Sequence, residues 1–117
     1  MASRTVRLAT GSTTNLTLLS VSPALNLTGL LATNTAAYAI FVKFYWFDKS
    51  TGAAVAPTVG TTLPDLTINV PTASSFNIRF DGITKRGDLW VAVTKLAADT
   101  DTTATVAGDG LITFFLG

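Results

Sequence analysis

An aromatic segment at residues 38–49 limits what this chain can fold into more than any other feature. Six aromatic side chains lie within it: Tyr38, Phe41, Phe44, Tyr45, Trp46 and Phe47. With the two-residue period of a strand it has two apolar faces, the second interrupted only by Lys43. Small sandwiches bury one face of each strand, so a second apolar face predicts an additional covering surface. We expect another protein chain to supply that surface.

The two faces of this segment lead to different expectations. Ile40, Val42 and Phe44 share the face expected in the core. Phe41, Tyr45 and Phe47 share the other face and are predicted self-association anchors, because burying each ring contributes about 1.5–3 kcal/mol before the costs of association. In the alternative interpretation both faces are buried within the monomer, with residues 25–33 covering the outer face of a middle strand.

Composition favours an all-β protein of one domain. The chain is 48% hydrophobic and only 13% charged, and it contains no glutamate or glutamine. Its polar side chains are mainly threonine, which favours strands, whereas the two missing residue types are good helix formers. The length of 117 residues predicts a single domain spanning residues 1–117.

Turn-forming residues separate eight segments with strand patterns. Apolar and polar residues alternate most regularly in residues 66–70, 76–80 and 89–94. The other segments are residues 5–9, 15–21, 25–33, 38–49 and 111–116, of which the leucine-rich ones are also compatible with helix. Residues 111–116 are apolar on both faces, which predicts a central strand or an interface. Together these segments predict an antiparallel β-sandwich of jelly-roll type.

The residue inventory disfavours an enzyme. The chain has no histidine and no cysteine, which removes the commonest general base, the commonest transition-metal ligand and the most reactive nucleophile. No cofactor is expected. Asp99, Asp101 and Asp109 are the best candidates for a cation site, because Ca²⁺ takes clustered oxygen ligands from loops. The alternative is that these aspartates hydrogen-bond turn backbone.

Two further motifs each have a functional and a structural interpretation. Arg86-Gly87-Asp88 spells a tripeptide that integrins bind when it is displayed, but Gly-Asp before a strand is also ordinary turn chemistry. Trp90 lies on the polar side of its strand and could stack on a sugar. A protein interface is the alternative for Trp90.

Charge and hydropathy exclude two classes of partner. The net charge of +1 gives no long-range attraction to nucleic acid or to an anionic membrane. The longest apolar stretch is interrupted by Lys43 and is too short for a transmembrane helix. The first eleven residues lack the apolar run of a signal peptide, so synthesis in the cytoplasm is expected.

Several short stretches resemble a group of small β-rich virion proteins of tailed bacteriophages. The stretches are Lys43-Phe44-Tyr45, Asp48-Lys49, residues 56–61, Pro64, residues 68–71, residues 80–83 and residues 97–103. Trp46-Phe47 and the longer stretch at residues 50–55 depart from that group. The resemblance implies a structural virion component that decorates or cements the capsid shell.

This resemblance and the apolar faces together predict the partners. We expect a homo-oligomer, with a trimer favoured over a dimer, that binds the major capsid protein on the virion surface. Arg4, Arg7 and Pro57 are the predicted capsid contacts, in the N-terminal segment and the loop at residues 50–62. The alternatives are a small tail or fibre component, and a carbohydrate-binding sandwich that uses Trp90 and residues 99–109.

Overall fold

Eight strands account for the regular structure of the computed structural model, which describes residues 4–20, 27–47, 56–83 and 88–117. The strands are β1 (Arg4–Ala9), β2 (Thr17–Ser20), β3 (Leu27–Asn34), β4 (Ile40–Phe47), β5 (Leu66–Val70), β6 (Ser74–Ile83), β7 (Asp88–Thr94) and β8 (Gly110–Leu116). Each predicted segment overlaps one of these strands, with ends shifted by a few residues. Within the described residues no helix has the length and apolar character needed to cross a bilayer.

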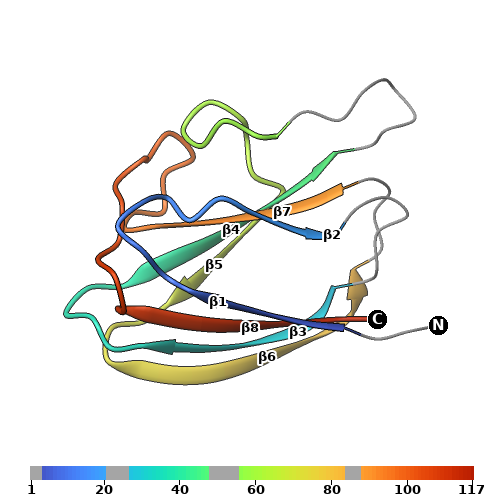
Figure 1. Ribbon diagram of the computed structural model, residues 1–117, viewed down its shortest axis with the longest axis horizontal. Coiled ribbons are helices and arrows are strands. Elements are labelled where there is room, and N and C mark those ends of the chain that lie inside the picture. Colours follow the sequence, from blue (N-terminus) through green and yellow to red (C-terminus); the bar gives the residue numbers. More distant parts are fainter. Residues whose placement is uncertain (1–3, 21–26, 48–55, 84–87) are drawn as a thin grey trace.

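The strands form two antiparallel sheets that pack face to face (Figure 1). One sheet has the order β1-β8-β3-β6 and the other the order β2-β7-β4-β5. Successive strands therefore tend to alternate between the sheets, which is the arrangement of an eight-stranded jelly roll built from two Greek keys. The predicted antiparallel sandwich of jelly-roll type is confirmed.

A single hydrophobic core fills the space between the sheets. All eight strands contribute to it, and its most buried members include Leu30, Val42, Phe44, Val91 and Phe114, each 0% exposed. The Phe44 and Phe114 rings meet edge to face across the core, with centroids 5.7 Å apart. This geometry matches the quadrupoles of the two rings and links the two sheets.

The central strands have the positions that their apolar character predicts. β4 lies between β7 and β5, and β8 lies between β1 and β3. Ile40, Val42 and Phe44 point into the core, as predicted for that face of residues 38–49. The central position predicted for residues 111–116 is confirmed as well.

One buried asparagine joins the two sheets at the end of β3. The amide nitrogen of Asn34 donates hydrogen bonds to the carbonyl oxygens of Tyr38, Val70 and Pro71 at 2.8, 3.2 and 3.1 Å. Its side-chain oxygen accepts the backbone N–H of Ala36 at 2.9 Å. Asn34 thereby fixes the β3–β4 turn against the β5–β6 turn. Because its side chain is only 1% exposed, it needs these partners within the protein.

Candidate functional site

The outer face of the β2-β7-β4-β5 sheet is covered by the chain itself, and we call it the covered face. Residues 95–106, between β7 and β8, lie against it and bond to its central lysine, Lys43. Residues 56–65, which lead into β5, pack beside them (Figure 1). That packing is close, because a Cβ on Gly60 would lie 2.5 Å from Thr102 Cγ2. These segments bury the middle of the covered face, whereas Leu18, paired with Trp90 on the edge strand, remains 39% exposed.

This cover corrects the exposure predicted for the self-association anchors. Tyr45 is 1% exposed, so the expectation of an exposed ring there is wrong. Phe41 is half-buried, and the side chain of Phe47 lies outside the described residues. The alternative interpretation, burial within the monomer, is correct for Tyr45. Its covering segment was misassigned, because residues 27–34 form β3 of the opposite sheet.

Lys43 is the polar centre of the covered face. It is 0% exposed, and its Nζ donates a hydrogen bond to the carbonyl oxygen of Ala98 at 2.7 Å. Burial lowers the pKa of Lys43, and the negative charges of Asp101 and Asp99 oppose that fall. Lys43 thus connects the middle of the sheet to the segment that covers it.

Asp101 holds the covering segment, residues 95–106, in place through hydrogen bonds to its backbone. Its carboxylate accepts the backbone N–H of Leu96 at 2.9 Å, and both the backbone N–H and the hydroxyl of Thr103 at 3.1 and 2.6 Å. Burial by itself would raise the pKa of Asp101, but these hydrogen bonds and the charge of Lys43 outweigh it, so the pKa is lowered. The turn interpretation of Asp101 is therefore correct.

A second carboxylate closes the end of the sandwich. Asp109 accepts a hydrogen bond from the Tyr38 hydroxyl, which in turn accepts the backbone N–H of Val106 at 3.1 Å. Lys95 Nζ lies 4.3 Å from the centroid of the Tyr38 ring, in a cation–π contact. Burial and the bond to Asp109 raise the pKa of Tyr38. Among the described residues, no group of three or more acidic side chains is placed to hold a metal ion.

Trp90 lies beside Tyr45 on the covered face. The two residues are directly paired between β7 and β4. Trp90 Nε1 and the Tyr45 hydroxyl are both buried without a hydrogen-bond partner. Trp90 is half-buried. Less of its ring surface is therefore accessible for the sugar stacking considered for this residue. Burial raises the pKa of Tyr45, and the charge of Asp99 raises it further.

No segment among the described residues covers the outer face of the β1-β8-β3-β6 sheet in this way, and we call it the open face. The strand pairing arranges twelve residues in three rows of four. The rows are Thr5-Phe115-Gly29-Arg79, Arg7-Thr113-Leu31-Asn77 and Ala9-Leu111-Thr33-Ser75. Phe115 and Leu31 are 39% and 43% exposed, and they are diagonal neighbours near the middle of the face.

The charged side chains in the three rows of the open face have one sign. Arg7 and Arg79 are exposed on its two edge strands, β1 and β6. None of the twelve residues in the three rows is acidic. The described aspartates lie apart from these rows: Asp81 belongs to β6, two residues after Arg79, and Asp65, Asp88, Asp99, Asp101 and Asp109 lie in β7 or in connections between strands. This face can therefore bind an apolar surface that has carboxylates at its edge.

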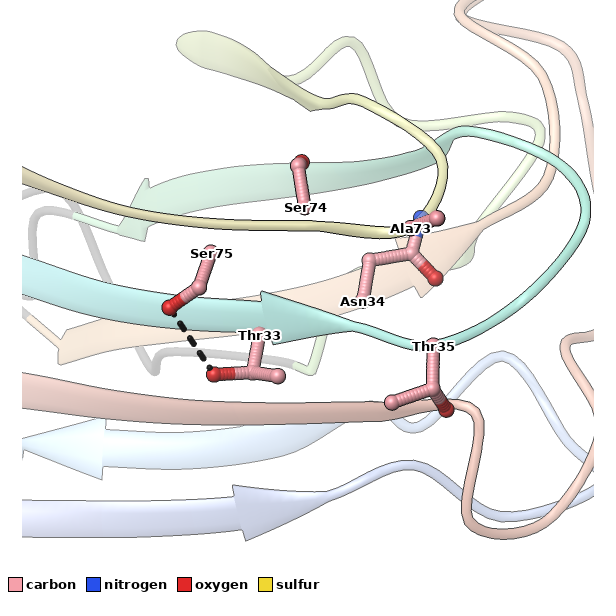
Figure 2. A pocket seen from close by; sticks show the side chains of 6 residues that line it. All are labelled: Thr33, Asn34, Thr35, Ala73, Ser74 and Ser75. Carbon is pink, nitrogen blue, oxygen red and sulfur yellow. Dashed lines mark hydrogen bonds between the residues drawn. The ribbon is translucent and has the colours of Figure 1, made fainter.

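A shallow recess of about 400 Å³ lies at one end of the open face (Figure 2). It is lined by Thr33, Asn34, Thr35, Ala73, Ser74 and Ser75. Thr33 and Ser75 hydroxyls are hydrogen-bonded to each other at 3.2 Å, and the Ser74 and Thr35 hydroxyls donate to the carbonyl oxygens of Pro71 and Asp109. Its polar groups are thus engaged within the chain, and none of its lining residues is titratable.

The remaining predicted residues fall in different places. Arg7 lies on the open face, whereas the side chain of Arg4 lies outside the described residues. Pro57 is buried, so the expectation that it lies exposed as a surface contact is wrong. Asp88 is 6% exposed at the start of β7, and Arg86 and Gly87 lie outside the described residues. A buried aspartate is in line with the turn interpretation of that tripeptide.

No protein-family model, curated protein or solved structure matches this chain. The choice between its surfaces therefore rests on geometry. The middle of the covered face is occupied by the chain's own residues 95–106, with Leu18 exposed at its β2 edge, whereas the open face leaves Leu31 and Phe115 in solvent near its middle. The sequence analysis expected exposed apolar side chains at residues 41–47, whereas among the described residues Tyr45 is buried and Phe115, in the doubly apolar segment at residues 111–116, is exposed.

Proposed function

We propose that this protein is a structural virion protein of a tailed bacteriophage that decorates the capsid. In this proposal its open face docks on the assembled shell of the major capsid protein. The single observation that carries the proposal is the open face itself: four paired strands expose Leu31 and Phe115 between Arg7 and Arg79. The resemblance of residues 38–117 to small β-rich virion proteins supplies the identity of the partner.

The rigidity of the open face supports a docking role. Its backbone is held by continuous ladders, from Arg4↔Leu116 to Ala9↔Leu111 between β1 and β8, and from Gly29↔Phe115 to Asn34↔Gly110 between β3 and β8. A preformed surface loses little conformational entropy on binding. A subunit that binds only the assembled shell then stabilises that shell by mass action.

The charge of the open face indicates what the capsid surface must offer. Two arginines flank exposed apolar side chains, and a fully buried arginine needs a carboxylate partner. The proposed contact on the capsid is therefore an apolar patch with acidic residues at its rim. Such complementarity chiefly sets the rate and specificity of association, while the apolar centre supplies most of the affinity.

The test is binding to empty, expanded capsids of the phage that encodes this chain. We expect the purified protein to pellet with the capsids and to raise their resistance to heat. Phe115→Ser should reduce binding by at least tenfold, because loss of a central apolar anchor costs more than about 1.4 kcal/mol. Leu63→Ser is the matched control, since Leu63 is 72% exposed but lies in the connection before β5.

Three outcomes separate the alternatives. Absence of binding by the unaltered protein would exclude capsid decoration, and binding to isolated tails instead would favour the tail or fibre role. Equal losses for Phe115→Ser and Leu63→Ser would remove the open face as the docking surface. Circular dichroism of both variants should match that of the unaltered protein, because both side chains are exposed.

A further inference from the structure

Strand β6 is an exposed edge with a regular ladder behind it. It spans ten residues, the longest of the described strands, and it lies at the end of its sheet, where it pairs with β3. The pairing runs without a shift from Gly29↔Arg79 to Asn34↔Ser74. The backbone of residues 74–79 therefore presents a straight row of hydrogen-bonding groups on its outer side.

The other edge strands are less suited to pairing with a further strand. β2 has four residues and a register shift between Leu18 and Ser20. β5 has five residues, with Pro64 and Pro71 close to its two ends. β1 equals the regular stretch of β6 in length, at six residues, but it contains two arginines, Arg4 and Arg7, against one in residues 74–79. Residues 74–79 contain no proline, no lysine and no acidic residue, which are common devices that protect an edge, and Arg79 is their one charged side chain, with Asp81 two residues further along β6.

The hydrophobic core is incompletely closed beside β6. Ile78 and Phe80 point toward the core from this strand but remain half-buried. The corresponding inward residues of the central strand β8, Ile112 and Phe114, are 0% exposed. A strand added at β6 would cover the remaining apolar surface if its own inward side chains were apolar. A second copy of β6 meets that requirement with its own Ile78.

The sequence of β6 is complementary to itself when the two-fold axis passes through Ile78. A two-fold axis through Ile78 pairs Ile78 with Ile78 of the second copy, in an antiparallel arrangement. The same axis places Asn77 opposite Arg79 of the second copy, twice by symmetry, so each guanidinium can donate to a carboxamide oxygen. An axis through Arg79 would instead oppose two like charges, which is unfavourable.

We infer that β6 is a self-association edge, through which two copies form an antiparallel two-fold dimer centred on Ile78. The two β1-β8-β3-β6 sheets then become one continuous sheet of eight strands, with both cores on one side and both open faces on the other. This geometry gives a dimer, whereas the sequence favoured a trimer. The inference is independent of the proposed capsid role, because its test needs no capsid.

Sedimentation velocity over a range of protein concentrations tests the dimer. Asn77→Arg should weaken dimerisation by about 2- to 30-fold, the range for two symmetry-related pairs of like charges opposed across a sheet. Asn77→Asp should strengthen it over the same range, because each new carboxylate faces Arg79 of the second copy. The matched control is Thr5→Arg, which adds an arginine at an exposed position of β1, the opposite edge of the same sheet. It should leave the dimer unchanged.

Hydrogen exchange supplies an independent readout. Amide protection in residues 74–79 should rise with protein concentration in the unaltered protein, and Asn77→Arg should need an about 2- to 30-fold higher concentration for the same rise. A monomer at every concentration would overturn the inference, and so would an oligomer that Asn77→Arg and Thr5→Arg affect equally. Protection that rises in β1 instead of β6 would overturn it as well.

Discussion

Tyr45→Phe is predicted to stabilise this protein. The Tyr45 side chain is 1% exposed, and its hydroxyl is buried without a hydrogen-bond partner. An unsatisfied hydroxyl of this kind costs about 1–3 kcal/mol, because it loses its bonds to water and gains none. Removing the oxygen also removes some packing, so we expect a net gain of about 1–2 kcal/mol. For a domain of this size the melting temperature should rise by about 4–8 °C.

The stabilisation by Tyr45→Phe should also depend on pH. Burial, with help from the charge of Asp99, raises the pKa of Tyr45 above its ordinary value of 10.0. The unfolded chain therefore releases this proton at a lower pH than the folded protein, so the unaltered protein loses stability as the pH rises above about 10. Phenylalanine has no proton to lose at this position. The advantage of Tyr45→Phe should thus grow in alkaline solution.

The other tyrosine of the chain is the matched control. The Tyr38 hydroxyl donates to the Asp109 carboxylate and accepts the backbone N–H of Val106. Tyr38→Phe should therefore destabilise the protein, by about 1 kcal/mol because this ring is partly exposed. Urea unfolding of both variants at pH 7 measures the two effects. A loss of stability in Tyr45→Phe would refute the reasoning, since it would mean that the hydroxyl has a partner in solution.

Two further substitutions test the covering segment and the open face. Asp101→Asn should lower the free energy of unfolding by about 1–3 kcal/mol at pH 7. The pKa of Asp101 is lowered from its ordinary value of 3.8, so the stability difference between the two proteins should shrink as the pH falls below about 4. Unfolding at pH 7 and at pH 3 measures this change, and an equal difference at the two pH values would contradict the argument. Gly29→Ala should cost about 1–3 kcal/mol by calorimetry, because its Cβ would lie 2.7 Å from the carbonyl oxygen of Ile78. Gly11→Ala, whose Cβ would meet Asn15 Oδ1 at an ordinary 3.5 Å, should cost less, and equal costs would contradict the steric explanation.

The fold could be predicted from the sequence because its determinants are local. Residues 66–70 and 89–94 alternate with a period of two, and a slip of one residue would expose their apolar faces. Residues 111–116 are apolar on both faces, and β8 indeed lies centrally between β1 and β3. A chain of eight such segments joined by turns can form only a few antiparallel sandwich topologies, and the jelly roll is one of them.

The covered face could not be predicted because its cover has no pattern. Residues 95–106 are rich in alanine and threonine and are typical of a polar connection. Their position depends on contacts between residues far apart in the chain, such as the bond from Lys43 to Ala98 and the packing of Thr102 beside Gly60. One local indication was present in the sequence: a lysine in the middle of an aromatic face needs an acceptor, which a backbone carbonyl can provide.

The dimer inferred at β6 would change what the open face can do. A two-fold axis perpendicular to the sheet leaves both open faces on the same side, so each dimer presents Arg7, Arg79, Leu31 and Phe115 twice. On a surface with repeated binding sites, the second contact becomes intramolecular and is strengthened by its effective concentration. A face that binds weakly as a monomer could then hold firmly as a dimer. Edge pairing and face docking are therefore compatible, because the first uses the backbone of β6 and the second uses side chains normal to the sheet.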